Sequence, residues 1–254
     1  RRVLFRSIAE SAMEKVLTEH LQNLHGADTE IASIIQRPLP EPKLADATGT
    51  INAGDRDVNV LLTMKHPRVV VFGNLLSDDE CDAIIAAAKP RMKRSLTVET
   101  KTGGEEVNAD RTSDGMFFQR EEIPVVAVLE RRVARLLNWP ENHGEGLQVL
   151  HYQPGAEYKP HYDYFDPTQP GTPTILKRGG QRVGTLVIYL NNPEAGGGTS
   201  FPDVGVEVAP RRGNAVFFSY AAPDPSTKTL HGCSPVVRGE KWIATKWLRE
   251  REFR

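Results

Sequence analysis

From about residue 146 onward, the sequence repeats one pattern, a short apolar or alternating run followed by glycine or proline. Alternating polarity over four to eight residues is typical of a half-buried strand, and glycine and proline interrupt such runs. We expect strands over residues 146–152, 158–164, 183–190, 206–208, 214–219 and 241–248. Many short strands separated by turns are typical of a barrel or a double-sheet jelly roll. This half of the chain therefore predicts a β-rich core.

Two helices and a strand are predicted upstream of this region. Ser77 and the three acidic residues after it resemble a helix N-cap, so we expect a helix body over residues 81–88. Residues 124–137 have apolar side chains at helical spacing and end before Trp139-Pro140. An apolar run over residues 69–72 predicts a strand. Helices followed by strands predict an α+β fold, with the helices packed outside a β core.

The first sixty residues differ from the rest of the chain. Residues 8–25 carry apolar side chains near helical spacing, residues 37–43 are rich in proline, and residues 44–60 are small and polar. We therefore expect a helical N-terminal appendage and linker over residues 1–60 and a second domain over residues 61–254.

Charge and composition narrow the classes of partner. The formal net charge is −1, so nothing predicts a nucleic-acid partner. No apolar run approaches the roughly 20 residues of a membrane span. The two cysteines, Cys81 and Cys233, are too few for a disulfide framework and fit a reducing compartment. We expect a cytoplasmic protein because no targeting segment is visible.

The most specific local pattern is His161-Tyr162-Asp163. In an extended strand, residues two apart point to the same face, so His161 and Asp163 could bind one metal ion. An isolated His-x-Asp is more often an ordinary polar pair, and a site needs a third ligand. His231, which we expect at the end of a strand, is the best candidate. Two histidines and one carboxylate with open positions are the arrangement of non-haem Fe(II) oxygenases.

Other residues could contribute to such a site, although each has an ordinary alternative. Lys241 opens a predicted strand and could hold a carboxylate, but a lysine beside a turn is usually solvated. Thr199 follows three glycines and could donate a hydrogen bond, but this segment equally fits a flexible hairpin. Tyr152 and Tyr158 flank the same hairpin as the His-x-Asp pair. Tyrosines on strands usually pack in a core or at its rim, although Tyr152 could also contact a co-substrate.

Taken together in chain order, these residues belong to a series of motifs. The series is Tyr152-x5-Tyr158-x2-His161-x-Asp163, Gln181-Arg182, Tyr189-Leu190-Asn191, Gly196-Gly-x-Thr199-x-Phe201-Pro202 and His231-Gly-x-x-Pro235-Val236-x-x-Gly239-x-Lys241-Trp242. It resembles the prolyl 4-hydroxylase family, the collagen-type branch of the Fe(II)/2-oxoglutarate dioxygenases. The resemblance extends over residues 66–250 and leaves out the first sixty residues.

The resemblance implies a double-stranded β-helix (jelly-roll) core with flanking helices. It implies an enzyme similar to procollagen-proline 4-dioxygenase, which hydroxylates C4 of prolyl residues in a peptide or protein and releases succinate and CO2. The cofactor would be Fe(II), with 2-oxoglutarate and O2 as co-substrates and ascorbate as a bound reductant.

The resemblance also implies roles for individual residues. It implies that Fe(II) binds to His161, Asp163 and His231. Lys241 would pair with the C5 carboxylate of 2-oxoglutarate, helped by Tyr152 and Thr199. Positions near the peptide substrate would be Tyr158, Arg182 and Trp247. Residues 165–181 lie where the family has variable substrate-covering loops, so a peptide preference does not carry over.

Several alternatives remain open at this point. The same scaffold could oxidise a free amino acid or a different residue type. A catalytically silent binding barrel would not need both the triad and Lys241. A zinc hydrolase could use the same ligands, although structural zinc sites prefer four protein ligands. The sequence also leaves open a homodimer, which residues 1–60 could mediate.

Overall fold

The computed structural model describes residues 38–44, 49–95, 97–98, 102, 104–106 and 110–254. Residues Leu39–Arg254 form one compact unit. The helix predicted within residues 8–25 lies outside the described residues. Within the described part of the chain, no helix is both long and apolar enough to span a bilayer.

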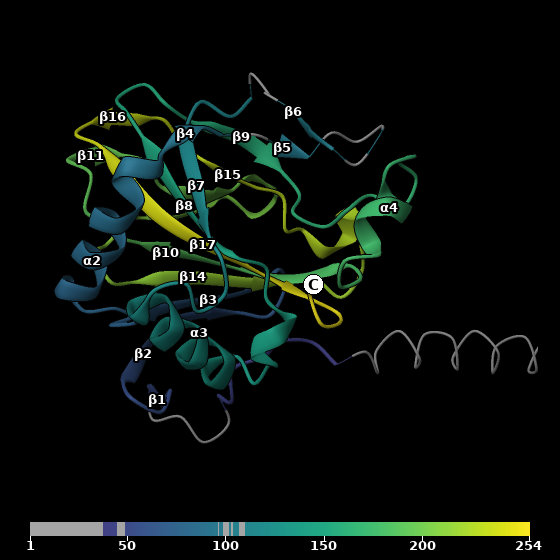
Figure 1. Cartoon of the computed structure of the whole chain (residues 1–254), viewed down its shortest axis with the longest axis horizontal. Helices are drawn as coiled ribbons and strands as arrows, with labels where there is room; N and C mark the ends of the chain where they lie inside the picture. Colours follow the sequence, from purple (N-terminus) through teal and green to yellow (C-terminus); the bar gives the residue numbers. More distant parts are fainter. Residues whose placement is uncertain (1–37, 45–48, 96, 99–101, 103, 107–109) are drawn as a thin grey trace, which may run out of the picture. The chain divides into compact units, whose positions relative to one another are not determined.

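A nine-stranded antiparallel sheet forms the centre of this unit (Figure 1). Its strand order is β1-β2-β3-β14-β10-β17-β8-β7-β4. The bounds are β1 (Thr50–Asn52), β2 (Asp57–Met64), β3 (Arg68–Gly73), β4 (Lys93–Arg94), β7 (Asp114–Phe118), β8 (Leu147–Tyr152), β10 (Arg182–Tyr189), β14 (Ala215–Ser219) and β17 (Lys241–Arg249). Strands far apart in sequence, such as β3 and β14 or β10 and β17, are neighbours in this sheet. The chain therefore crosses between strands and does not form a simple meander.

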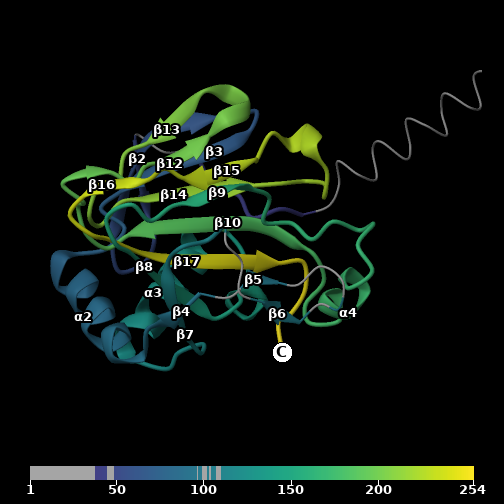
Figure 2. The same cartoon turned by 90° about the horizontal axis from the view of Figure 1, so that it is seen from above.

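A second, four-stranded sheet has the order β13-β12-β15-β9. Its strands are β9 (Tyr158–His161), β12 (Thr199–Phe201), β13 (Val206–Val208) and β15 (His231–Cys233). Two further strand pairs are β11 (Ala195–Gly196) with β16 (Val236–Arg238), and β5 (Thr97–Val98) with β6 (Glu105–Glu106). In Figure 2 the four-stranded sheet lies on one face of the central sheet, and helices α2 and α3 lie on the opposite face.

The α-helices of the described residues are α2 (Asp78–Ala88), α3 (Pro124–Leu136) and the short α4 (Thr172–Leu176). Single 3₁₀ turns cover Lys89–Arg91, Glu141–His143, Pro202–Val204 and Pro225–Thr227. Helix α2 begins with a capping box, because the Ser77 side chain accepts from the Glu80 N–H and the Glu80 side chain accepts from the Ser77 N–H. The sequence predicted both long helices correctly.

The middle strands of the central sheet are buried on both faces, which creates two apolar cores. Along β10, Leu186 and Ile188 pack on the helix side, while Val187 and Tyr189 pack between the two sheets. This alternation follows from the two-residue period of a strand, whose side chains point to opposite faces in turn. The paired sheets and the helices on one outer face are the predicted α+β jelly roll.

Strand β17 has the same alternation, and its polar residues are buried too. Trp242, Ala244 and Leu248 lie in the helix-side core. Lys246 shares that face and forms an ion pair with Glu130 of α3. The odd-numbered residues therefore point between the two sheets, and among them are Lys241, Trp247 and Arg249, all buried. This inner face of β17 is the wall on which the candidate site is built.

The prediction that residues 44–60 form a linker was wrong for residues 50–60. Residues 50–60, predicted as part of a linker, lie largely in β1 and β2, which extend the central sheet next to β3. Three strands therefore precede α2, so the helices do not come before all the strands. The polar composition of residues 44–60 suggested a linker because β1 and β2 are mostly exposed at the sheet edge.

Candidate active site

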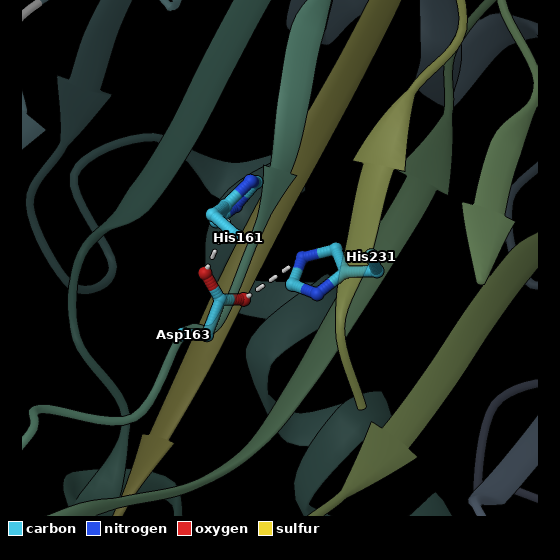
Figure 3. A group of neighbouring side chains, drawn as sticks. All are labelled: His161, Asp163 and His231. Atoms are coloured by element: carbon cyan, nitrogen blue, oxygen red, sulfur yellow. Dashed lines mark ion pairs between the residues drawn. The ribbon is translucent and has the colours of Figure 1, made fainter. Parts of the chain in front are cut away.

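His161, Asp163 and His231 come together between the two sheets (Figure 3). His161 ends β9 and His231 begins β15, and the two residues are direct partners across the strand pair. Asp163 lies beyond the end of β9, not on the strand as predicted, and His231 starts its strand instead of ending it. The chain turns after His161, so the carboxylate of Asp163 faces both imidazoles.

The distances within this cluster suit a single metal ion. His161 Nε2 lies 3.4 Å from Asp163 Oδ1, and His231 Nε2 lies 3.5 Å from Asp163 Oδ2. The three ligand atoms all lie within 4.8 Å of one another. Neighbouring ligands bound at 2.0–2.2 Å on an octahedral ion are about 3 Å apart, so a slight contraction would complete the site. No other His, Cys, Asp or Glu cluster of this kind occurs among the described residues.

Backbone carbonyl oxygens orient both imidazoles, so that one ring nitrogen of each can bind a metal ion. His161 Nδ1 lies 2.9 Å from the Lys159 carbonyl oxygen, and His231 Nδ1 lies 3.0 Å from that of Thr229. A carbonyl only accepts, so each Nδ1 carries the proton and each Nε2 keeps its lone pair for a metal. Burial lowers the pKa of His231 to about 4, which keeps this imidazole neutral near pH 7.

Two side chains hold the carboxylate of Asp163. Thr185 Oγ1 and Trp247 Nε1 donate to Asp163 Oδ2 at 2.7 and 3.0 Å. Burial alone would raise the pKa of Asp163, but the pKa lies well below its ordinary value, and the positive charge of the nearby Arg182 contributes to this lowering. Asp163 is therefore an ionised ligand with a fixed orientation.

The donor set fits Fe(II). It consists of two neutral imidazoles and one carboxylate on one side of the ion position, which leaves the other positions open. Cys233, two residues after His231, is no fourth ligand, because its sulfur accepts a hydrogen bond from Lys241 Nζ at 3.1 Å. The three-ligand set therefore differs from a closed structural zinc site.

Lys241 is a buried cation near the triad, since the sulfur that it contacts belongs to Cys233, two residues after His231. The Lys241 side chain is 1% exposed, and the Tyr152 and Tyr189 rings lie 5.4 and 5.8 Å from Nζ. Among the described residues, no carboxylate forms an ion pair with this ammonium group. A buried charge without a counter-ion is costly, so this ammonium group favours binding of an anion.

Thr199 and Tyr152 lie near the same ammonium group, Tyr152 directly and Thr199 through Tyr189. The Tyr189 hydroxyl donates to Thr199 Oγ1 at 2.8 Å, which leaves the Thr199 hydroxyl hydrogen available for another acceptor. Tyr152 is the cross-strand partner of Lys241 and is buried. The structure thus brings Lys241, Tyr152 and Thr199 close together.

The three residues predicted near a peptide have different surroundings. Tyr158 is half-buried and stacks on His161 with ring centroids 3.7 Å apart. Arg182 forms a bidentate ion pair with Glu145, at 2.7 and 3.0 Å, and lies over the Trp247 ring. Trp247 is buried and donates to Asp163. In this structure Trp247 is therefore a support for the triad, and the guanidinium of Arg182 already has a partner.

Sequence reasoning assigned no role to three residues of this site: Thr185, Tyr189 and Glu145. Thr185 and Tyr189 occupy alternate positions of an otherwise apolar strand. A polar side chain on the buried face of such a strand is a usable signal, because it needs a partner. Glu145 lies in a turn before β8, where nothing in the local sequence distinguishes it from a solvated glutamate.

Comparison with known proteins agrees with this geometry. Residues 147–249 match the model of the 2OG-Fe(II) oxygenase superfamily. Prolyl 4-hydroxylase 5 of Arabidopsis thaliana is 40% identical over 223 residues, which are 79% of this chain and 74% of the relative. Prolyl 4-hydroxylase 1 of the same plant is 39% identical over 202 residues, or 73% and 70% of the two chains.

Solved structures give the same picture. The 2OG complex of a viral collagen prolyl hydroxylase from Paramecium Bursaria Chlorella virus-1 has a TM-score of 0.54 and 31% identity, covering 71% of this chain and 95% of that one. A Pseudomonas putida prolyl-4-hydroxylase shares the fold, with a TM-score of 0.51 and 21% identity over 73% and 94% of the chains. The chain belongs to the prolyl 4-hydroxylase family within the 2OG-Fe(II) oxygenase superfamily.

Proposed function

We propose that this protein is an Fe(II)- and 2-oxoglutarate-dependent dioxygenase that hydroxylates C4 of prolyl residues in a peptide or protein. The observation that carries the proposal is the pairing of a three-ligand metal cluster with a buried, unpaired lysine on one wall between the sheets. Membership of the prolyl 4-hydroxylase family supports the reaction. The names of the relatives support a prolyl substrate.

In this proposal His161, Asp163 and His231 hold Fe(II). With the ion bound, O2 and 2-oxoglutarate supply the oxidation of a C–H bond, and succinate and CO2 are released. The chain's own contribution is geometric and electrostatic. The Lys159 and Thr229 carbonyls accept from the two Nδ1 atoms and so orient each Nε2 toward the ion position. Because Thr185 and Trp247 occupy Asp163 Oδ2, the carboxylate is held in one rotation.

Lys241 provides the site for the distal carboxylate of 2-oxoglutarate. A charge-assisted hydrogen bond from Nζ would replace the weak contact with Cys233 and neutralise the buried ammonium. Thr199 has a hydroxyl hydrogen to donate to the same carboxylate. Tyr152 lies beside Lys241 on the neighbouring strand β8, with its ring centroid 5.4 Å from Nζ. These residues orient the co-substrate, so that its other end reaches the metal.

Tyr158 is the best placed of the three candidate peptide contacts, because it is half-buried and stacks on a metal ligand. A prolyl ring could pack on this aromatic face while the triad lies beside it. Arg182 and Trp247 would act mainly through Asp163 and Glu145, with direct peptide contact as a further role. Ascorbate as reductant and a homodimer stay predictions.

The test is incubation of the full chain with Fe(II), 2-oxoglutarate, ascorbate and a library of proline-rich peptides. A +16 mass shift on proline that requires 2-oxoglutarate, matched by succinate release, would support the proposal. Asp163→Ala should abolish both products, while His151→Ala should keep them, because His151 pairs with Glu240 and stacks on Trp242 outside the triad.

Two results would change the assignment. Succinate release without peptide oxidation, followed by oxidation of a free amino acid or another residue type, would favour the same-scaffold alternative. Full turnover in Asp163→Ala would contradict the metal assignment.

A further inference from the structure

The inner face of β17 ends in a buried arginine that binds a distant loop. Arg249 is 1% exposed. Its Nη2 donates to the carbonyl oxygens of Ile175 and Arg178 at 3.1 and 2.6 Å, and its Nη1 donates to Glu145 Oε1 at 3.1 Å. The two carbonyls belong to α4 and the residues just after it, which Figure 2 shows beside the end of β17.

The Ile175 carbonyl also accepts from the Arg178 N–H at 3.2 Å, so Arg249 adds a second donor there. The last carbonyls of a helix have no partner within the helix, and a cation there also interacts favourably with the helix dipole. Arginine can reach two carbonyls and a carboxylate at once, because its guanidinium presents donors in a flat fork. A lysine at position 249 has a single nitrogen and could not reproduce this geometry.

Helix α4 lies within residues 164–181, a segment that follows Asp163 directly; we call it the post-triad loop. Its base is closed by Gln181, whose side-chain oxygen and nitrogen pair with the Phe165 N–H and carbonyl at 2.8 and 2.7 Å. Gln181 and Glu250 also exchange a backbone hydrogen bond of 2.9 Å, from the Glu250 N–H. A shift of this loop would therefore pull on Asp163.

A second route leads from Arg249 to the triad through Glu145. Glu145 Oε1 accepts from both Arg249 and Arg182. Arg182 Nη1 donates to the carbonyl oxygen of Asp163 at 3.3 Å. The guanidinium carbons of Arg182 and Arg249 lie 4.7 and 5.0 Å from the centroid of the Phe165 ring. Arg249 thus contacts the carbonyls of Ile175 and Arg178, the ring of Phe165 and the carboxylate of Glu145, which in turn pairs with Arg182.

We propose that Arg249 is a positioning residue that holds the post-triad loop against the metal triad, so that the loop forms a fixed wall of the peptide site. The inference rests on the proposed hydroxylase function. Arg249 lies eight residues from Lys241 on the nine-residue strand β17, which is about 27 Å in an extended strand. Binding of 2-oxoglutarate at Lys241 should therefore be independent of the loop.

The test compares Arg249→Met with Arg251→Met in the full chain. Arg251 is a matched control, because its Nη2 contacts the Leu176 carbonyl at 3.3 Å from the exposed side and makes no contact with Glu145. We expect Arg249→Met to raise the peptide KM about tenfold and to lower the ratio of hydroxyproline to succinate. The KM for 2-oxoglutarate should stay within about twofold, and Arg251→Met should resemble the wild type.

Arg249→Lys separates the effect of positioning from that of charge. It keeps the positive charge but loses the planar set of N–H donors of the guanidinium. It should behave like Arg249→Met in the product ratio. An unchanged peptide KM and product ratio in Arg249→Met, with the wild type active, would overturn the inference while leaving the hydroxylase function intact. A uniform fall in all parameters together with a lower Tm would also overturn it, because it would indicate a merely structural role.

Hydrogen exchange gives a readout that does not need the peptide reaction. In Arg249→Met, the amides of residues 172–180 should exchange faster than in Arg251→Met, while those of β10 keep their protection. Equal exchange in the two variants would overturn the inference. Absence of peptide hydroxylation in the wild type would instead count against the proposed function. Hydrogen exchange does not depend on that reaction, so the two failures can be told apart.

Discussion

The indole N–H of Trp247 donates to Asp163 Oδ2 at 3.0 Å, although the two residues are 84 positions apart in the chain. Thr185 donates to the same oxygen at 2.7 Å. Trp247 and Thr185 are cross-strand partners in β17 and β10, so one pair of neighbouring residues holds the carboxylate. The metal cluster thus depends on two strands that contribute no ligand.

Replacing Trp247 by Phe should weaken metal binding, because the ring remains and only the hydrogen bond is lost. Loss of such a supporting contact typically costs 10–100-fold in metal affinity, and we expect about tenfold. Anaerobic titration with Fe(II) would measure it. Trp242→Phe is the control, since Trp242 lies on the helix side of the same strand and stacks on His151. Equal affinities in both variants would contradict the role of Trp247.

Replacing Lys241 by Met should raise the KM for 2-oxoglutarate sharply. Truncating one partner of a buried charge pair costs about 2–5 kcal/mol, and 2 kcal/mol corresponds to roughly 30-fold. Steady-state kinetics at saturating peptide would measure the change. The peptide KM should move by less than about threefold, because the contacts of the ammonium are with Tyr152, Tyr189 and Cys233, none of which is a proposed peptide contact. An unchanged KM for 2-oxoglutarate would remove Lys241 from this role.

Breaking the buried ion pair between Lys246 and Glu130 should destabilise the fold. Both side chains are buried between β17 and α3, so Glu130→Ala would leave an unpaired buried ammonium. We expect a loss of about 3–5 kcal/mol in the free energy of unfolding, measured with urea. The double variant Glu130→Leu, Lys246→Met should recover most of it. Glu194→Ala, which breaks an exposed pair with Arg238, should cost about 1 kcal/mol or less.

Acid should weaken the junction between α2, α3 and the loop before β2. Arg132 donates to Asp55 and Glu80, and these contacts lower both carboxyl pKa values; burial opposes them at Glu80 without reversing the direction. With lowered pKa values, the folded state binds fewer protons than the unfolded state near the ordinary values of 3.8 and 4.5. The stabilisation is therefore complete above about pH 5 and is lost as pH falls through the folded-state pKa values.

The measurement for this junction is the free energy of unfolding from pH 7 to pH 3 in wild type and Glu80→Gln. The variant should have the smaller decrease over this range, because one of the two titrating carboxylates is gone. A parallel decrease in both proteins would show that Glu80 does not contribute to acid sensitivity.

Strand positions and candidate ligands could be derived from the sequence because they depend on local patterns. The alternation in residues 183–190 reports a strand buried on both faces, and β10 spans Arg182–Tyr189. Ser77 and its acidic neighbours define the start of α2 through the capping box. His161 and Asp163 are close in the chain, and the motif series named Lys241, Thr199 and Tyr152 as well.

The residues that hold the ligands in place are brought to them by pairing between strands far apart in the sequence. No local sequence pattern encodes that pairing. His231 meets His161 because β15 pairs with β9, and Trp247 meets Asp163 because β17 lies beside β10. Glu145 and Arg249 look like ordinary surface charges in sequence, yet both are buried. The sequence alone determined most of the strand and helix pattern and named the candidate metal and co-substrate residues. Only the tertiary structure decided which buried polar groups orient them, because burial and partner choice are set by how the sheets fold over each other.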